Sequence, residues 1–193
     1  MFKGSRPSRV RVDVLGGFRV RSRLFLTFIG FLLAGPAHSA ESWREYTYPE
    51  AGFSASFPRK PVIAKRLSKT SQSRNGAVTE RIYSVNESGV IYSISVMDFT
   101  KAEADPDIAV GEVASALMGL GRLAFDESMY VDSMHGREIV VIGEDGTRYT
   151  DGIFYVRRLL YQMKVVYPAI NRDPAGSSGI SIFLAQFHFT NPF

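Results

Sequence analysis

The feature that most constrains this chain is a strict alternation of apolar and polar side chains in several of its segments. In the segment 159–167, apolar and aromatic residues take every second position: Leu159, Tyr161, Met163, Val165 and Tyr167. A period of two places such residues on one face of a half-buried β-strand. Because the segments 78–85 and 90–99 alternate in the same way, the sequence predicts a sheet rather than a helical bundle.

Short turns separate these segments and predict that the strands pair antiparallel. Gly89 ends the turn that starts at Asn86, Asp145-Gly146 is a typical hairpin pair, and Arg157-Arg158 joins the last two long strands. A further turn is predicted over residues 132–136. Additional strands are expected at 43–48, 53–57, 61–67, 123–131, 137–142 and 147–157.

Two helices are expected beside this sheet. The first begins after Asp105-Pro106, because aspartate caps a helix and proline is favoured in its first turn. It should end at Met118, before Gly119, and bury one stripe: Val110, Val113, Ala114, Leu117 and Met118. The second helix would start at Ser178, although the residues 187–190 could instead form a short closing strand. The fold class predicted is α+β, a mainly antiparallel sheet flanked by helices.

The first 40 residues have the three parts of a secretory signal peptide. A basic stretch runs to Arg23, an apolar run covers 24–33, and small residues lead to Ala40. The apolar run is shorter than the roughly 20 residues that span a bilayer. We expect a signal peptide over 1–40, cleaved near Ser39 or Ala40, and a single periplasmic or secreted domain over 41–193. An uncleaved N-terminal anchor is the alternative.

Charge and cysteine content narrow the function of that domain. Seven of the 23 basic residues and one of the 19 acidic residues lie in the first 40, which leaves 16 basic and 18 acidic residues. A slightly acidic domain is not expected to bind nucleic acid. The chain has no cysteine, which excludes disulfides, thiol catalysis and cysteine metal sites.

The segment 48–58, Tyr-Pro-Glu-Ala-Gly-Phe-Ser-Ala-Ser-Phe-Pro, resembles the opening of PsbP-like domains. The later order of a long helix, a meander and a C-terminal amphipathic helix is also similar. Uncharacterised secreted bacterial proteins share the same Gly-Phe-Ser start. The resemblance implies an α/β/α sandwich and an accessory or binding role, as in extrinsic photosystem subunits and a Ran-binding import factor. It supplies no catalytic residues to carry over.

The sequence contains no recognisable catalytic or metal-binding constellation. His135 is expected on a surface turn, where Asp132 and Ser133 are too close in sequence to form a triad with it. His188 is expected on the polar face of a closing strand. Glu144-Asp145 and Asp105/Asp107 do not have the spacing of a calcium loop, and Gly119-Leu-Gly121 follows a helix instead of preceding one, unlike a phosphate loop.

A basic span is the candidate for partner binding. It comprises Arg59, Lys60, Lys65, Arg66, Lys69 and Arg74, with no acid between Gly52 and Thr79. Such a span could attract an anionic partner, or it could be an ordinary solvated loop. Trp43, Tyr46 and Tyr48 could form a binding patch but are more typical of a core.

We therefore expect a non-enzymatic, exported accessory or binding protein that acts through surface contacts and needs no cofactor. Its partner would be an envelope protein or an anionic surface, and it would meet the membrane only during export. The alternative is a small-molecule or lipid carrier with a cavity between sheet and helix. A hydrolase is the third hypothesis, and it would require a cleft with a histidine near a hydroxyl or carboxylate.

Overall fold

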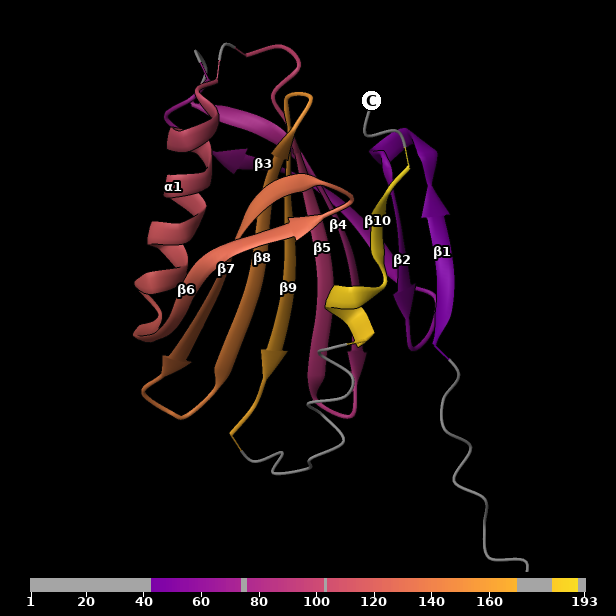
Figure 1. The fold of residues 1–193 in the computed structure, drawn as a ribbon, viewed down its shortest axis with the longest axis vertical. Coiled ribbons are helices and arrows are strands. Elements are labelled where there is room, and N and C mark those ends of the chain that lie inside the picture. The colour runs from indigo at the N-terminus through magenta and orange to yellow at the C-terminus, as the bar shows by residue number, and fades with distance from the viewer. Residues whose placement is uncertain (1–42, 74–75, 103, 170–181, 191–193) are drawn as a thin grey trace, which may run out of the picture. The chain divides into compact units, whose positions relative to one another are not determined.

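The computed structural model describes residues 43–73, 76–102, 104–169 and 182–190, and the strands in these ranges form two antiparallel sheets (Figure 1). The larger sheet has the order β3-β4-β5-β9-β8-β7-β6. Its strands are β3 (Val62–Lys69), β4 (Ala77–Glu87), β5 (Val90–Asp98), β6 (Gly121–Val131), β7 (Met134–Gly143), β8 (Arg148–Val156) and β9 (Leu159–Tyr167). The smaller sheet has the order β1-β2-β10. Its strands are β1 (Arg44–Tyr48), β2 (Phe53–Phe57) and β10 (Phe187–Phe189). The predicted α+β class with a mainly antiparallel sheet is confirmed.

The helix α1 (Pro106–Met118) begins and ends where the sequence predicts. The Asp105 carboxylate accepts hydrogen bonds from the backbone N–H groups of Asp107 and Ile108, at 2.9 and 3.2 Å, and so caps the first turn. The buried stripe is shifted relative to the prediction. Its fully buried members are Ala109, Ala114 and Leu117, whereas Val110, Val113 and Met118 are only partly buried.

The two faces of the larger sheet are covered differently (Figure 1). One face packs against α1 around Ile139, Ile153 and Leu160. The other face packs against the smaller sheet and the helical turn at 182–185. The expected α/β/α sandwich is therefore only partly correct, because within the described ranges the second covering layer is a sheet. Its central strand β2 is buried at every position, so sheet-on-sheet packing replaces the second helical layer.

Aromatic side chains hold the smaller sheet in place. Phe53 stacks on Phe187 with ring centroids 5.6 Å apart, and Phe183 lies edge-on to Phe57 at 5.4 Å. Trp43 meets Tyr92 edge-on at 5.0 Å. Trp43, Tyr46 and Tyr48 all pack against this core, so their interpretation as core residues is confirmed.

The turn predicted over 132–136 is shorter than expected. Asp132 and Ser133 alone form it, both with positive φ, 48° and 66°. β7 consequently starts at Met134, and His135 lies on a strand, so its predicted place on a turn was wrong. Two consecutive residues with positive φ give a tight hairpin whose twist suits the flanking strands. The hairpin predicted through Arg157-Arg158 is confirmed, and these two residues also have positive φ, 51° and 63°.

The tip of the β6–β7 hairpin reaches β10 (Figure 1). The Asp132 carboxylate accepts a 2.8 Å hydrogen bond from the backbone N–H of Phe189 and lies 3.1 Å from Nδ1 of His188. His188 is exposed between two buried phenylalanines, which confirms its predicted position on the polar face of a closing strand. Among the described residues, no helix has the length and apolar character needed to cross a membrane.

Candidate functional site

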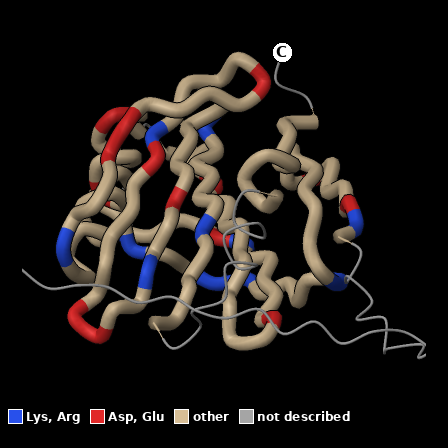
Figure 2. The backbone as a smooth tube through the Cα atoms, turned by 60° about the horizontal axis from the view of Figure 1, so that its bottom comes forward, with Lys and Arg blue, Asp and Glu red and all other residues tan. Residues whose placement is uncertain are grey.

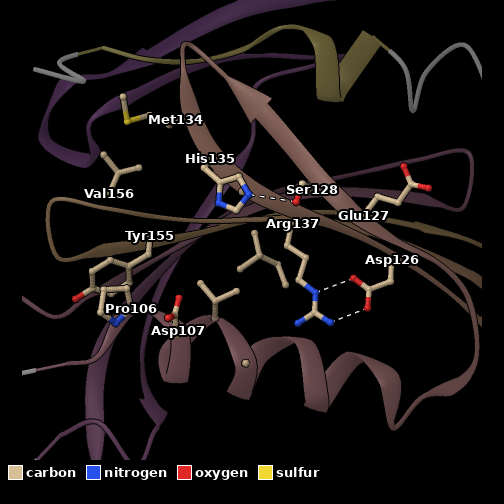
Figure 3. Close-up of a pocket in the computed structure, with 14 residues that line it drawn as sticks. Pro106, Asp107, Asp126, Glu127, Ser128, Met134, His135, Arg137, Tyr155 and Val156 are labelled. Carbon is tan, nitrogen blue, oxygen red and sulfur yellow. Dashed lines mark hydrogen bonds and ion pairs between the residues drawn. The ribbon is translucent and has the colours of Figure 1, made fainter.

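A groove of about 700 Å³ lies between the N-terminal half of α1 and strands β6, β7 and β8 (Figure 3). Its apolar walls come from Val110, Met134, Ile153 and Val156. Its polar groups are Asp107, Asp126, Glu127, Ser128, His135, Arg137 and the Tyr155 hydroxyl. Mixed walls and a volume between about 300 and 1,000 Å³ are typical of small-molecule sites.

A glycine on α1 lines the groove. Ala114 and Leu117 fix the C-terminal half of the helix on the sheet, whereas Gly111 lines the groove in the N-terminal half. A Cβ added at Gly111 would meet no atom within 4 Å. The groove is therefore open beside this residue. Gly136, by contrast, is tightly packed, because a Cβ there would lie 2.4 Å from the Phe154 ring.

Arg137 and Asp126 form a two-pronged ion pair on the sheet side of the groove (Figure 3). Arg137 donates from Nε to Oδ1 at 2.7 Å and from Nη2 to Oδ2 at 2.6 Å. These hydrogen bonds lower the pKa of Asp126 and raise the pKa of Arg137. Because each charge satisfies the other, the pair contributes a fixed polar surface and little net charge.

His135 and Ser128 meet in the same groove. The Nε2 atom of His135 lies 3.2 Å from Oγ of Ser128, and the imidazole packs against Tyr130 with centroids 5.2 Å apart. The groove therefore meets the condition given above for a hydrolase, a cleft with a histidine near a hydroxyl. The orienting acid is not in place, since Asp132 is engaged with β10 and no carboxylate within the described ranges hydrogen-bonds to His135.

Tyr155 closes the end of the groove next to the start of α1. The centroid of its ring lies 5.9 Å from that of Phe99, and Asp107 lines the same groove (Figure 3). Burial raises the pKa of the Tyr155 hydroxyl. The positive charge of Arg158 lowers this pKa, and the negative charge of Asp105 raises it. The phenol therefore remains protonated at neutral pH and can donate a hydrogen bond to a ligand.

A second polar cluster lies on the same face of the sheet but outside the groove. Asp151 on β8 is completely buried. Its Oδ1 accepts a hydrogen bond from Gln162 and lies 3.8 Å from Nζ of Lys164, while Oδ2 has no hydrogen-bond partner within the described part of the chain. Burial raises the pKa of Asp151 to about 6, and Lys164 and Gln162 only partly offset this effect.

The basic span does not gather on one face. Arg59 is 3.5 Å from Glu87, and Arg66 donates a 2.7 Å hydrogen bond to the buried Glu80, so these two cations are already paired. Lys65 and Arg66 are consecutive on β3 and therefore point to opposite faces. Lys60, Lys65 and Lys69 are exposed, and Arg74 lies outside the described residues. In the view of Figure 2, basic and acidic residues are interspersed.

One carboxylate of each acidic pair considered as metal ligands has a structural role. Asp105 caps α1, and Asp145 accepts two 2.9 Å hydrogen bonds from Thr147 within the β7–β8 turn. In the described ranges, no group of three or more histidine, aspartate or glutamate side chains is placed to hold a metal ion.

Gly121, at the start of β6, is needed for close contact between backbones, since a Cβ there would lie 2.3 Å from the carbonyl oxygen of Ile142.

Comparison with known proteins finds a distant likeness among solved structures. No protein-family model and no curated protein sequence matches the chain. The solution structure of cyanobacterial PsbP (CyanoP) from Synechocystis sp. PCC 6803 is similar to it, with 11% sequence identity and a TM-score of 0.48. That match covers 82% of this chain and 98% of the other. Such a distant likeness carries no information about function, which must be inferred from the groove and the surface.

Sequence reasoning did not find the groove. Its walls come from four elements, and their residues share no spacing that would mark a site. The one available signal was the Asp132-Ser133 turn. A prediction that centred the hairpin on these two residues would have paired Ser128 with Arg137 and placed His135 on the same face of the next strand.

Proposed function

We propose that this chain is an exported binding protein that takes a small molecule into the groove between α1 and the larger sheet. This function corresponds to the small-molecule carrier named above as the alternative to a protein that acts through surface contacts. One observation carries the proposal: an open groove of about 700 Å³ with apolar walls and polar groups from both the helix and the sheet.

The polar groups indicate the chemistry of the ligand. Among the charged groups of the groove, Arg137 and Asp126 neutralise each other at 2.6 Å, and the carboxylates of Asp107 and Glu127 also line it. Hydrogen-bonding capacity is left on Tyr155, His135 and Ser128. An uncharged molecule with an apolar body and hydroxyl or carbonyl groups would match the apolar and the polar walls of the groove. It could bind without breaking the ion pair between Arg137 and Asp126.

Native mass spectrometry of the gently purified protein tests this proposal. We expect an additional mass on the wild-type protein and its loss from Gly111→Leu, because Gly111 lines the groove and a Cβ at this position would meet no atom within 4 Å. Ser115→Leu is the matched control, because Ser115 is an exposed position of the same helix that does not line the groove.

Two outcomes would contradict the groove as the ligand site. One is an unliganded mass for the wild-type protein under all gentle conditions. The other is an additional mass that survives in Gly111→Leu. A hydrolytic role is less well supported, since the His135–Ser128 pair has no orienting carboxylate within the described residues.

A further inference from the structure

We propose that β3 is a docking edge, at which an extended acidic segment of a partner protein pairs as an additional strand of the larger sheet. This role is independent of the groove, because β3 lies at the opposite end of the sheet order from β6. It gives the basic span a more specific function than general attraction of anions.

The backbone of β3 is suited to strand addition. β3 is eight residues long and pairs with β4 from Val62↔Ser84 to Lys69↔Ala77 without a shift in register. No strand of the described ranges pairs with its other side. The opposite edge strand, β6, has a register irregularity between Leu123 and Phe125, a device that protects edges from pairing. Of the two edges, β3 is the regular one.

Three aliphatic side chains of β3 are exposed. Val62 is 73% exposed, Ile63 52% and Leu67 75%. Proteins normally protect an edge strand by keeping it short, bulged or highly charged, because its free N–H and C=O groups are a template for another strand. An eight-residue edge with three exposed aliphatic side chains offers both backbone hydrogen bonds and apolar contacts to an added strand.

The charges on β3 select the partner. Ile63, Lys65, Leu67 and Lys69 alternate along one face, since Ile63 is paired with the buried Tyr83 and successive side chains change sides. Neither lysine forms an ion pair with a described residue, whereas Arg59 and Arg66 do. A second copy of β3 would add two more lysines to this face and no carboxylate to neutralise them, which is unfavourable. An acidic strand is therefore the complementary occupant.

The alternation also predicts a pattern in the partner. On the face shared with Lys65 and Lys69, the added strand should carry acidic and aliphatic residues in turn, so that each lysine meets a carboxylate and each aliphatic side chain meets another. The intervening positions face the other side and are not constrained by these two lysines.

Fluorescence anisotropy with a defined peptide tests the inference. The probe carries glutamate and valine in turn at every second position, with threonine between them. A control probe has lysine in place of each glutamate, and a second control has the residues of the first in scrambled order. We expect the acidic patterned probe to bind at least about tenfold more tightly than either control, with an affinity that falls as salt is added.

Variants of the protein locate the contact. Lys65→Gln/Lys69→Gln should weaken binding of the acidic probe by about tenfold, and Lys65→Glu/Lys69→Glu should abolish it. Lys101→Gln, at an exposed lysine outside β3, should leave the affinity unchanged. Circular dichroism confirms that each variant is folded. The additional mass expected in the groove should persist in all of them, which separates a failure at β3 from a failure of the groove proposal.

Three results would overturn the inference. The first is absence of binding, which would make β3 a lysine-protected edge. The second is equal affinity for the acidic and basic probes. The third is concentration-dependent self-association in analytical ultracentrifugation that the lysine variants abolish, which would make the occupant a second copy of the chain.

Discussion

At the scale of single residues, Asp151 is the most unusual group in the described structure. A buried carboxylate normally satisfies both oxygens, yet Oδ2 of Asp151 has no described partner and Lys164 is 3.8 Å from the other oxygen. Desolvation outweighs these partial interactions and raises the pKa of Asp151 from 3.8 to about 6. The folded protein therefore holds this proton more tightly than the unfolded chain does.

This shift predicts a pH-dependent stability. The contribution of Asp151 is fully present below about pH 4 and is lost as the pH rises through 6, because the folded state then carries an unfavourable buried charge. Asp151→Asn should therefore raise the free energy of unfolding at pH 7.5 by about 2 kcal/mol, and by much less at pH 4. Urea unfolding at the two pH values measures this difference.

Asp145 provides a control of opposite sign. Hydrogen bonds from Thr147 lower the pKa of this carboxyl, so its contribution is present at neutral pH and is lost on acidification. Asp145→Asn should destabilise the protein slightly at pH 7.5. If Asp151→Asn also destabilised the protein there, the Asp151 carboxylate would have to be stabilised by its neighbours, contrary to the raised pKa.

At the scale of elements, the short strand β10 has a larger effect than its three residues suggest. Phe187 is buried and contacts Phe53, Tyr161 and Phe189. Phe187→Ala should lower the free energy of unfolding by about 3–5 kcal/mol, because it removes a buried aromatic ring and leaves a cavity. Chemical denaturation of the purified variant tests this expectation.

His188 in the same strand is the matched control. Its side chain is exposed and faces Asp132 at 3.1 Å. Exposed ion pairs contribute about 0–1 kcal/mol, so His188→Ala should change the stability by no more than that amount. Similar costs for the two variants would mean that β10 is held mainly by the Asp132 contacts and not by its aromatic side chains.

Most elements could be predicted because their signals are local. The period-two pattern of 159–167, the Asp105-Pro106 helix start and the Arg157-Arg158 turn each depend on neighbouring residues. The errors arose where the signal is not local. Met134, His135 and Gly136 resemble a turn in sequence, but pairing with β6 and β8 makes them a strand. The second sheet replaced an expected helical layer because β10 pairs with the distant β2.

At the scale of the whole molecule, the groove lies beyond sequence prediction for a related reason. Its residues come from α1, β6, β7 and β8, and only the packing of the helix on the sheet brings them together. The basic span shows that residues close in sequence need not form one surface. Six cations close in sequence suggested one patch, but the pleat of β3 and the acids Glu80 and Glu87 leave Lys65 and Lys69 as the free charges on one face of that strand.

Export remains a prediction for the molecule as a whole. If the first 40 residues are a signal peptide, the mature protein should begin at Ala40 or Glu41 and should be recovered from the periplasm or the medium. Intact-mass measurement and N-terminal sequencing of the secreted fraction test this. An Ala37→Glu/Ser39→Glu variant, in which two small positions before the cleavage site become charged, should retain the leader. A protein that keeps Met1 inside the cell would contradict the prediction.

The pairing of β10 with β2 also sets the order in which the protein can fold. The register joins Phe53 to Phe189, so the core between the two sheets cannot close until nearly all of the domain is available. Contacts between such distant residues are slow to form, because a long loop must be closed before they become favourable. The core between the two sheets will therefore stay open while the chain is being synthesised. An open chain is the form that can be threaded through a narrow translocation channel.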